Sequence, residues 1–236
     1  MYEKTTVIIF ANDLVCKGNT KKWITEIFFS KSCFFFSENC KFHNYLLSLP
    51  LFLRIFNNQN AMVIGVFCSA CQQLDNDFFQ LTEEFGRWAA SQGHSIVYGG
   101  VGLGLMETLA RAVSQAGGRT IGVVPRIAAS RGSSYTQVEI PCDNLSDRKQ
   151  IMQDQSDAFV AMPGGIGTLD EIFTVAASAT IGYHHRPVIL YNMKGFWQPL
   201  LRMLDDLQAT GVIRSQWTDY IRVASTLEEV ARLLDA

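Results

Sequence analysis

Residues 158–171, AFVAMPGGIGTLDE, contain an apolar strand, a glycine-rich turn and the start of a helix in direct succession. The run from Ala158 to Met162 is continuously apolar, as expected for a parallel strand that is buried on both faces. Pro163 to Thr168 then forms a loop with three glycines, and residues 167–181 have the pattern of a helix. Ligands in such α/β units lie beyond the carboxyl ends of the strands. This corner is therefore the predicted phosphate site.

The loop has the chemistry of an anion site. Glycines let a ligand approach the backbone without obstruction by a Cβ atom, and the N–H groups and dipole at a helix start favour an anion. Thr168 adds a hydroxyl group. The loop lacks the lysine of a Walker A motif and the spacing of a dinucleotide motif. An ordinary strand–turn–helix corner is the alternative, and it explains less well why Asp170 and Glu171 follow the glycines.

The alternation of strand and helix extends in both directions from this loop. The expected strands are 62–68, 95–98, 120–124, 136–140, 157–162, 187–191 and 220–223, and the expected helices are 75–92, 105–116, 144–155, 167–181, 197–209 and 226–234. Right-handed crossovers turn such repeats into a parallel sheet with helices on both faces. We expect one Rossmann-like α/β domain over residues 62–236.

Residues 1–61 differ in composition from the rest of the chain. They hold one of the 18 glycines and nine of the 16 phenylalanines, and they carry seven basic against four acidic residues. The apolar stretch from Tyr45 to Phe56 is shorter than the roughly 20 residues of a bilayer span. We expect a poorly ordered extension, translated upstream of a gene that begins at Met62. A targeting or membrane-contact segment is the alternative.

The net charge of −2 favours neither nucleic acid nor a membrane as partner. Six cysteines without a clear export signal favour the cytoplasm. Cys68 and Cys71 have C-x-x-C spacing, but no second pair or suitable histidines complete a metal site, so we expect buried or strand-end thiols.

Further candidate site residues lie in a second glycine cluster and on two of the expected helices. Gly99 and Gly100 begin a second glycine cluster, which is expected either to approach the same ligand or to form a tight turn. Arg148 suits bidentate recognition of a phosphate or a base. Its neighbour Lys149 is equally typical of a solvated helix face. Glu171 lies one turn into its helix, where an acid also interacts favourably with the helix dipole.

These residues resemble a known family. Tyr98-Gly99-Gly100, Gly104-Leu105-Met106, Asp147-Arg148-Lys149 and the run from Pro163 to Glu171 occur in the order found in LONELY GUY phosphoribohydrolases, long labelled lysine decarboxylase-like. The resemblance implies hydrolysis of a cytokinin-type purine riboside 5′-monophosphate to free base and ribose 5-phosphate. It also implies a homodimer or higher homo-oligomer and no metal or organic cofactor.

The resemblance assigns roles residue by residue. The catalytic pair falls on Arg148 and Glu171. The residues expected to bind substrate or phosphate are Gly99, Gly100, Met106, Lys149, Pro163, Gly164, Gly165, Gly167, Thr168 and Asp170. Decarboxylation of lysine normally needs pyridoxal phosphate on a lysine, and residues 62–236 contain only Lys149 and Lys194 outside any cofactor motif, which argues against that activity.

The chain departs from the family pattern at the base end of the site. The first loop reads Cys68-Ser69-Ala70-Cys71 instead of Cys-Gly-Ser-Ser, Gly132 stands where relatives have a glutamate, and residues 177–180 also differ. These departures leave two alternatives open: an AMP nucleosidase, and a non-catalytic nucleotide- or pterin-binding carrier. Glu107 is compatible with the carrier group.

Overall fold

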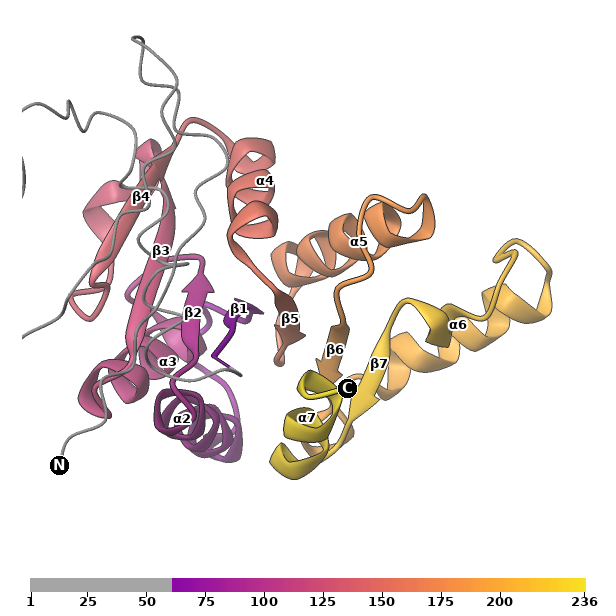
Figure 1. The fold of residues 1–236 in the computed structure, drawn as a ribbon, viewed down its shortest axis with the longest axis horizontal. Helices are drawn as coiled ribbons and strands as arrows, with labels where there is room; N and C mark the ends of the chain where they lie inside the picture. Colours follow the sequence, from indigo (N-terminus) through magenta and orange to yellow (C-terminus); the bar gives the residue numbers. More distant parts are fainter. Residues whose placement is uncertain (1–60) are drawn as a thin grey trace, which may run out of the picture. The chain divides into compact units, whose positions relative to one another are not determined.

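A computed structural model of the chain describes residues 61–236, and the predicted extension lies outside this range apart from Ala61. Its centre is a seven-stranded sheet in the order β4-β3-β2-β1-β5-β6-β7, in which every neighbouring pair is parallel (Figure 1). The strands are β1 (Val63–Phe67), β2 (Ser95–Tyr98), β3 (Arg119–Pro125), β4 (Val138–Cys142), β5 (Ala158–Ala161), β6 (Val188–Tyr191) and β7 (Arg222–Ala224). The predicted parallel sheet is confirmed.

The order of the strands reverses at β1. The chain runs outward from β1 through β2 and β3 to β4, then returns to place β5 on the other side of β1. The loops that follow β1 and β5 therefore diverge from adjacent strand ends. Such a switch point opens a crevice at the carboxyl edge of the sheet, which is where α/β proteins bind their ligands.

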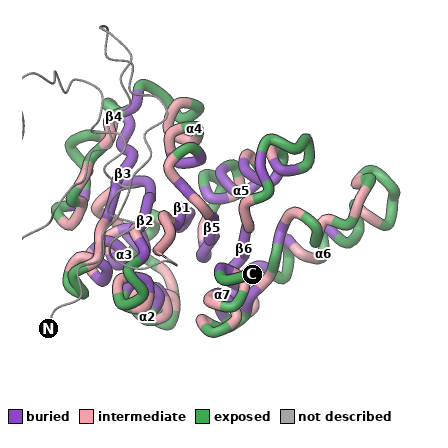
Figure 2. The backbone as a smooth tube through the Cα atoms, viewed as in Figure 1, coloured by how far each residue is buried: buried purple, intermediate pink, exposed green. Residues whose placement is uncertain are grey.

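Helices cover both faces of the sheet, as predicted. They are α2 (Asn76–Ser91), α3 (Gly104–Gln115), α4 (Leu145–Gln155), α5 (Ile166–Thr180), α6 (Gln198–Ala209) and α7 (Leu227–Leu234). Side chains of α2, α3 and α7 share one core cluster, and those of α4, α5 and α6 share the other. Successive strand residues such as Val97 and Tyr98 belong to opposite clusters, because side chains alternate along a strand. Figure 2 shows the central strands as the most buried part of the chain.

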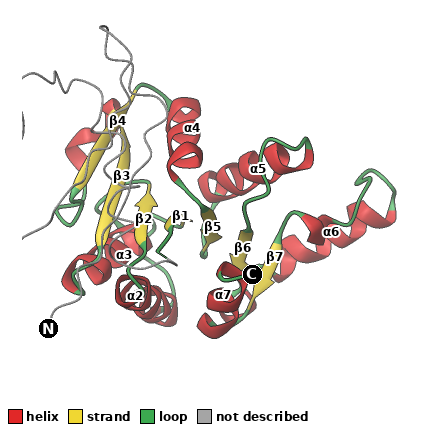
Figure 3. Ribbon diagram, viewed as in Figure 1, coloured by secondary structure: helices red, strands yellow, loops and turns green. Residues whose placement is uncertain are grey.

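Each expected strand and helix is present with boundaries within two residues of the prediction (Figure 3). The largest shift is at β4, which begins at Val138 and includes Pro141. Proline is tolerated there because β4 is an edge strand. Three short 3₁₀ turns were not predicted: η1 (Arg126–Arg131), η2 (Met193–Gly195) and η3 (Trp217–Asp219). Among residues 61–236, every helix is too short or too polar to cross a bilayer.

Candidate active site

A cavity of about 280 Å³ lies at the switch point of the sheet. Its walls come from the loop after β1, the first turn of α3, α4 and the glycine loop that begins α5. The lining residues are Cys68, Ser69, Ala70, Met106, Arg148, Gly165, Gly167, Thr168 and Glu171. Six of these nine are predicted site residues. The other three, Cys68 to Ala70, belong to the first loop, which the family resemblance places at the base end of the site but which was not among the predicted site residues. Their position directly after a buried strand is the signal that could have added them.

The backbone of Ser69 joins the first loop to its neighbours. Its N–H donates to the carbonyl of Pro163 at 3.1 Å, and its carbonyl accepts from the N–H of Leu105 at 2.9 Å. Gly104 makes this approach achievable, because a Cβ atom there would lie 2.5 Å from the backbone of Ala70 and Cys71. Its φ of +58° also favours glycine. The cavity therefore has a backbone framework that ties together three strand ends.

The glycines of the loop serve two different purposes. A Cβ atom at Gly164 would lie 2.1 Å from the hydroxyl of Thr168, so this glycine lets the threonine pack against the turn. At Gly165 and Gly167 a Cβ atom would meet nothing within 4 Å in the described part of the chain. Packing does not explain these two glycines. Their missing side chains leave open space at the start of α5, where N–H groups attract an anion.

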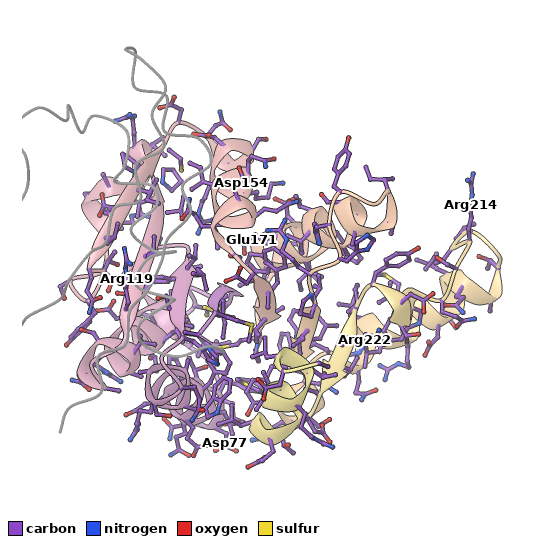
Figure 4. All side chains as sticks on the ribbon, viewed as in Figure 1. Asp77, Arg119, Asp154, Glu171, Arg214 and Arg222 are labelled. Carbon is purple, nitrogen blue, oxygen red and sulfur yellow. The ribbon has the colours of Figure 1, made fainter. Side chains whose placement is uncertain are left out.

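Arg148 reaches into the cavity from α4. Its Nε donates to the carbonyl of Val123 at 3.0 Å, and its Nη1 donates to Oε1 of Glu171 at 3.2 Å. The two side chains are 12% and 6% exposed. Figure 4 shows Glu171 on the inner side of α5, facing α4. The structure brings these two predicted site residues together, and the pair presents one fixed cation and one carboxyl group to the cavity.

Burial raises the pKa of Glu171 to about 7. The nearby guanidinium of Arg148 opposes this rise, Asp170 adds to it and Lys149 opposes it. A carboxyl group with a pKa near neutral pH can exchange a proton during a reaction, which an ordinary surface glutamate does poorly. Burial also raises the pKa of the Cys68 thiol, with a further contribution from Glu171, so this thiol stays protonated and is a poor nucleophile.

Lys149 and Asp170 form a second ion pair beside the first. The Nζ of Lys149 lies 2.7 Å from Oδ1 of Asp170 and 2.8 Å from Oδ2. The lysine is 19% exposed and the aspartate 49% exposed, and neither lines the cavity. Their role as substrate contacts stays a prediction.

The remaining predicted residues shape the loops around the cavity. Pro163 accepts the hydrogen bond from Ser69, as described above. Gly100 has a φ of +72°, and its carbonyl accepts from the N–H of Ser133 at 2.9 Å. Gly99 lies beside the guanidinium of Arg148. These three residues do not line the cavity, and their contact with substrate stays a prediction.

The cysteines of the described residues are all unpaired thiols. Cys68 is buried at the end of β1, as expected, whereas Cys71 is exposed and the expectation of a buried or strand-end position is wrong for it. No three His, Cys, Asp or Glu side chains within residues 61–236 are grouped to hold a metal ion.

A larger hollow of about 510 Å³ lies between α5 and the segment after α6. Apolar side chains such as Phe173, Val212 and Trp217 dominate its lining, and Arg214 is the one ionisable side chain there besides Tyr220. It contains none of the predicted site residues. The smaller cavity is therefore the candidate active site.

Comparisons with known proteins identify relatives of this chain. A family model described as "Possible lysine decarboxylase" matches residues 106–234. The chain is 33% identical over 169 residues to the cytokinin riboside 5′-monophosphate phosphoribohydrolase of Rhodococcoides fascians, and the match covers 70% of this chain and 85% of that protein. It is 31% identical over 171 residues to the Mycobacterium tuberculosis protein of the same name, with 72% and 91% covered.

Solved structures include similar folds with another role. The molybdenum cofactor carrier protein of Chlamydomonas reinhardtii has a TM-score of 0.58 and 26% identity, and the match covers 75% of this chain and 99% of that one. A molybdenum cofactor binding protein from Rippkaea orientalis has a TM-score of 0.56 at 23% identity, with 74% and 96% covered, a likeness in fold alone.

Proposed function

We propose that this chain, which belongs to the LONELY GUY family of phosphoribohydrolases, hydrolyses a cytokinin-type purine riboside 5′-monophosphate. The family model that it matches has the older description of a possible lysine decarboxylase. The reaction breaks the N-glycosidic bond and releases the free base and ribose 5-phosphate. The observation that carries the proposal is the buried Arg148–Glu171 pair, which lines the same cavity as the glycine loop.

The glycine loop is proposed to bind the 5′-phosphate. The open space at Gly165 and Gly167 supports this, because a phosphate there would reach the N–H groups at the start of α5. Thr168 lines the same cavity and can donate its hydroxyl. The guanidinium of Arg148 adds a positive charge on the opposite wall.

Glu171 is proposed to act on the reacting carbon. Cleavage of a glycosidic bond builds positive charge at the anomeric carbon, which a nearby carboxylate stabilises. In its ionised form Glu171 can also activate the attacking water, and in its protonated form it can donate to the departing base. Its pKa of about 7 makes both forms available at neutral pH. Arg148 is proposed to hold the substrate and to favour departure of the base.

The base is proposed to lie toward the loop after β1. Cys68, Ala70 and Met106 give this wall an apolar character, which suits an N6-prenyl substituent better than the bare amine of AMP. An AMP nucleosidase would use the same catalytic pair, so the preferred base distinguishes the two activities.

We place the protein in the cytoplasm as a homodimer or higher homo-oligomer that acts on small nucleotides rather than on nucleic acid or membranes. The unpaired thiols Cys68, Cys71 and Cys142 support a reducing compartment. The dimer rests on the family resemblance, and sedimentation velocity of the purified chain tests it: a monomer at micromolar concentration would overturn it.

A non-catalytic carrier is the second candidate, favoured by the 26% identity to the Chlamydomonas reinhardtii carrier protein. A carrier has no need for a carboxyl group with a raised pKa at the centre of its cavity, so the hydrolase is preferred.

The deciding experiment incubates the full-length chain with AMP and with N6-prenylated AMP and measures free base and ribose 5-phosphate. We expect release from the prenylated nucleotide. Release from AMP alone would replace the cytokinin assignment by an AMP nucleosidase. Tight binding of nucleotide or pterin without any release would favour the carrier.

A further inference from the structure

The guanidinium of Arg148 lies against Gly99, the first residue after β2. A Cβ atom at Gly99 would lie 1.7 Å from Nη2 of Arg148 and 3.0 Å from its Cζ. Ordinary contacts of a Cβ atom begin at about 3.4 Å. The guanidinium therefore occupies the volume that any other side chain at position 99 would take.

Space rather than backbone conformation accounts for glycine at this position. Gly100 has a φ of +72°, which favours glycine whatever its surroundings, but Gly99 is not among the residues with positive φ. The φ of position 99 therefore does not by itself require glycine. The obstacles to an alanine are the guanidinium of Arg148 and, at 3.1 Å from the Cβ position, the methyl group of Met106.

Two hydrogen bonds, to acceptors on different elements, also hold the guanidinium of Arg148 in this position. The carbonyl of Val123 on β3 holds Nε, and the carboxylate of Glu171 on α5 holds Nη1. The guanidinium is planar and rigid, so these two acceptors and the space at Gly99 define one position for it. A guanidinium displaced from Gly99 loses at least one of the two hydrogen bonds.

We propose that Gly99 is a positioning residue, whose missing side chain forms the slot that holds Arg148 against both Val123 and Glu171. This inference deepens the hydrolase function proposed above and rests on it. In this role Gly99 acts through Arg148, whether or not its backbone also contacts substrate. A shift of the guanidinium by about 1 Å is enough to lower turnover by about 100-fold in a preorganised site.

A double-mutant cycle in the full-length chain tests the slot. The variants are G99A, R148A and G99A/R148A, and the readouts are kcat and KM for base release. In the wild-type background we expect G99A to lower kcat/KM by about 100-fold, with kcat falling by a larger factor than KM rises, because the phosphate loop is intact and the displaced Arg148 no longer favours departure of the base. In the R148A background G99A is expected to change kcat by less than about twofold, because no guanidinium remains to be displaced.

Two outcomes would overturn the proposal: an equal loss from G99A in both backgrounds, or full activity of G99A alone. Thermal unfolding gives an independent measurement. The slot requires that G99A destabilises the R148A background less than the wild-type background, and an equal cost in both backgrounds also overturns the proposal. Should the wild-type chain release no base, the hydrolase function fails, while the unfolding cycle still decides whether Gly99 forms the slot.

Discussion

Two ion pairs join α4 to α5, and their residues are sequence neighbours on each helix. Arg148 meets Glu171 in the inner pair, and Lys149 meets Asp170 in the outer pair. The inner carboxylate is 6% exposed and the outer one 49% exposed. Both pairs have comparable separations, so distance does not distinguish them. Burial does: water screens the outer pair, whereas the inner glutamate has a pKa of about 7 and faces the cavity.

The largest expected effect comes from removing the inner carboxyl group. Glu171→Gln keeps the shape of the side chain but cannot exchange a proton, so turnover should fall by at least about 100-fold. Nucleotide affinity, measured by calorimetry, should change by less than about fivefold, because the phosphate site is intact. Unchanged turnover would remove Glu171 from the mechanism.

Removing the inner cation should affect stability strongly. Arg148→Ala leaves Glu171 buried without its partner, which costs about 3–5 kcal/mol of unfolding free energy when the carboxylate is ionised. Denaturant unfolding at pH 8 measures this loss. The cost should shrink at pH 5, where Glu171 carries a proton. Arg148→Lys is the matched control, since it retains the charge; an equal cost at both pH values would contradict the interpretation.

The raised pKa of Glu171 also predicts how the wild-type stability depends on pH. The folded state holds this proton up to a pKa of about 7, against an ordinary value of 4.5. Folded protein therefore binds more protons than unfolded protein between these values, and stability falls as pH rises through this window. The loss amounts to about 3 kcal/mol. Urea unfolding of wild type and Glu171→Gln across pH 4–8 measures the difference, which should vanish if Glu171 titrates normally.

The outer pair should have the smallest effect. Asp170→Asn and Lys149→Met are each expected to cost less than about 1 kcal/mol of stability, as exposed ion pairs do. They should nevertheless move the pKa of Glu171 in opposite directions, because Asp170 raises it and Lys149 lowers it. The acidic limb of the kcat/KM profile should shift down in Asp170→Asn and up in Lys149→Met. Shifts of the same sign would show that the outer pair acts through packing instead.

Much of this molecule could be predicted from local pattern. The strand, the three glycines and the two acids between Ala158 and Glu171 contain the proposed phosphate site within 14 consecutive residues. Helix and strand periods elsewhere identify every major element of residues 61–236. Such features depend on neighbours in the chain, and a sequence read in order displays them directly.

Other parts of the site depend on residues far apart in the chain. The walls formed by Cys68 and Ala70 were missed as site residues, because only the adjacency of β1 and β5 places them opposite the glycine loop. Gly99 looks like any turn glycine until Arg148, from α4, is seen to fill its place.

The sequence by itself determined the α/β alternation, the glycine loop proposed to bind an anion and the pair of residue types that could carry the chemistry. Local sequence pattern alone did not determine which of Arg148 and Lys149, or of Asp170 and Glu171, would face the cavity, and the choice of Arg148 and Glu171 came from the family resemblance. Consecutive residues point about 100° apart around a helix, so each pair has one inner and one outer member. The packing of α4 and α5 on the sheet made Arg148 and Glu171 the inner members, and burial in that position gives Glu171 its raised pKa.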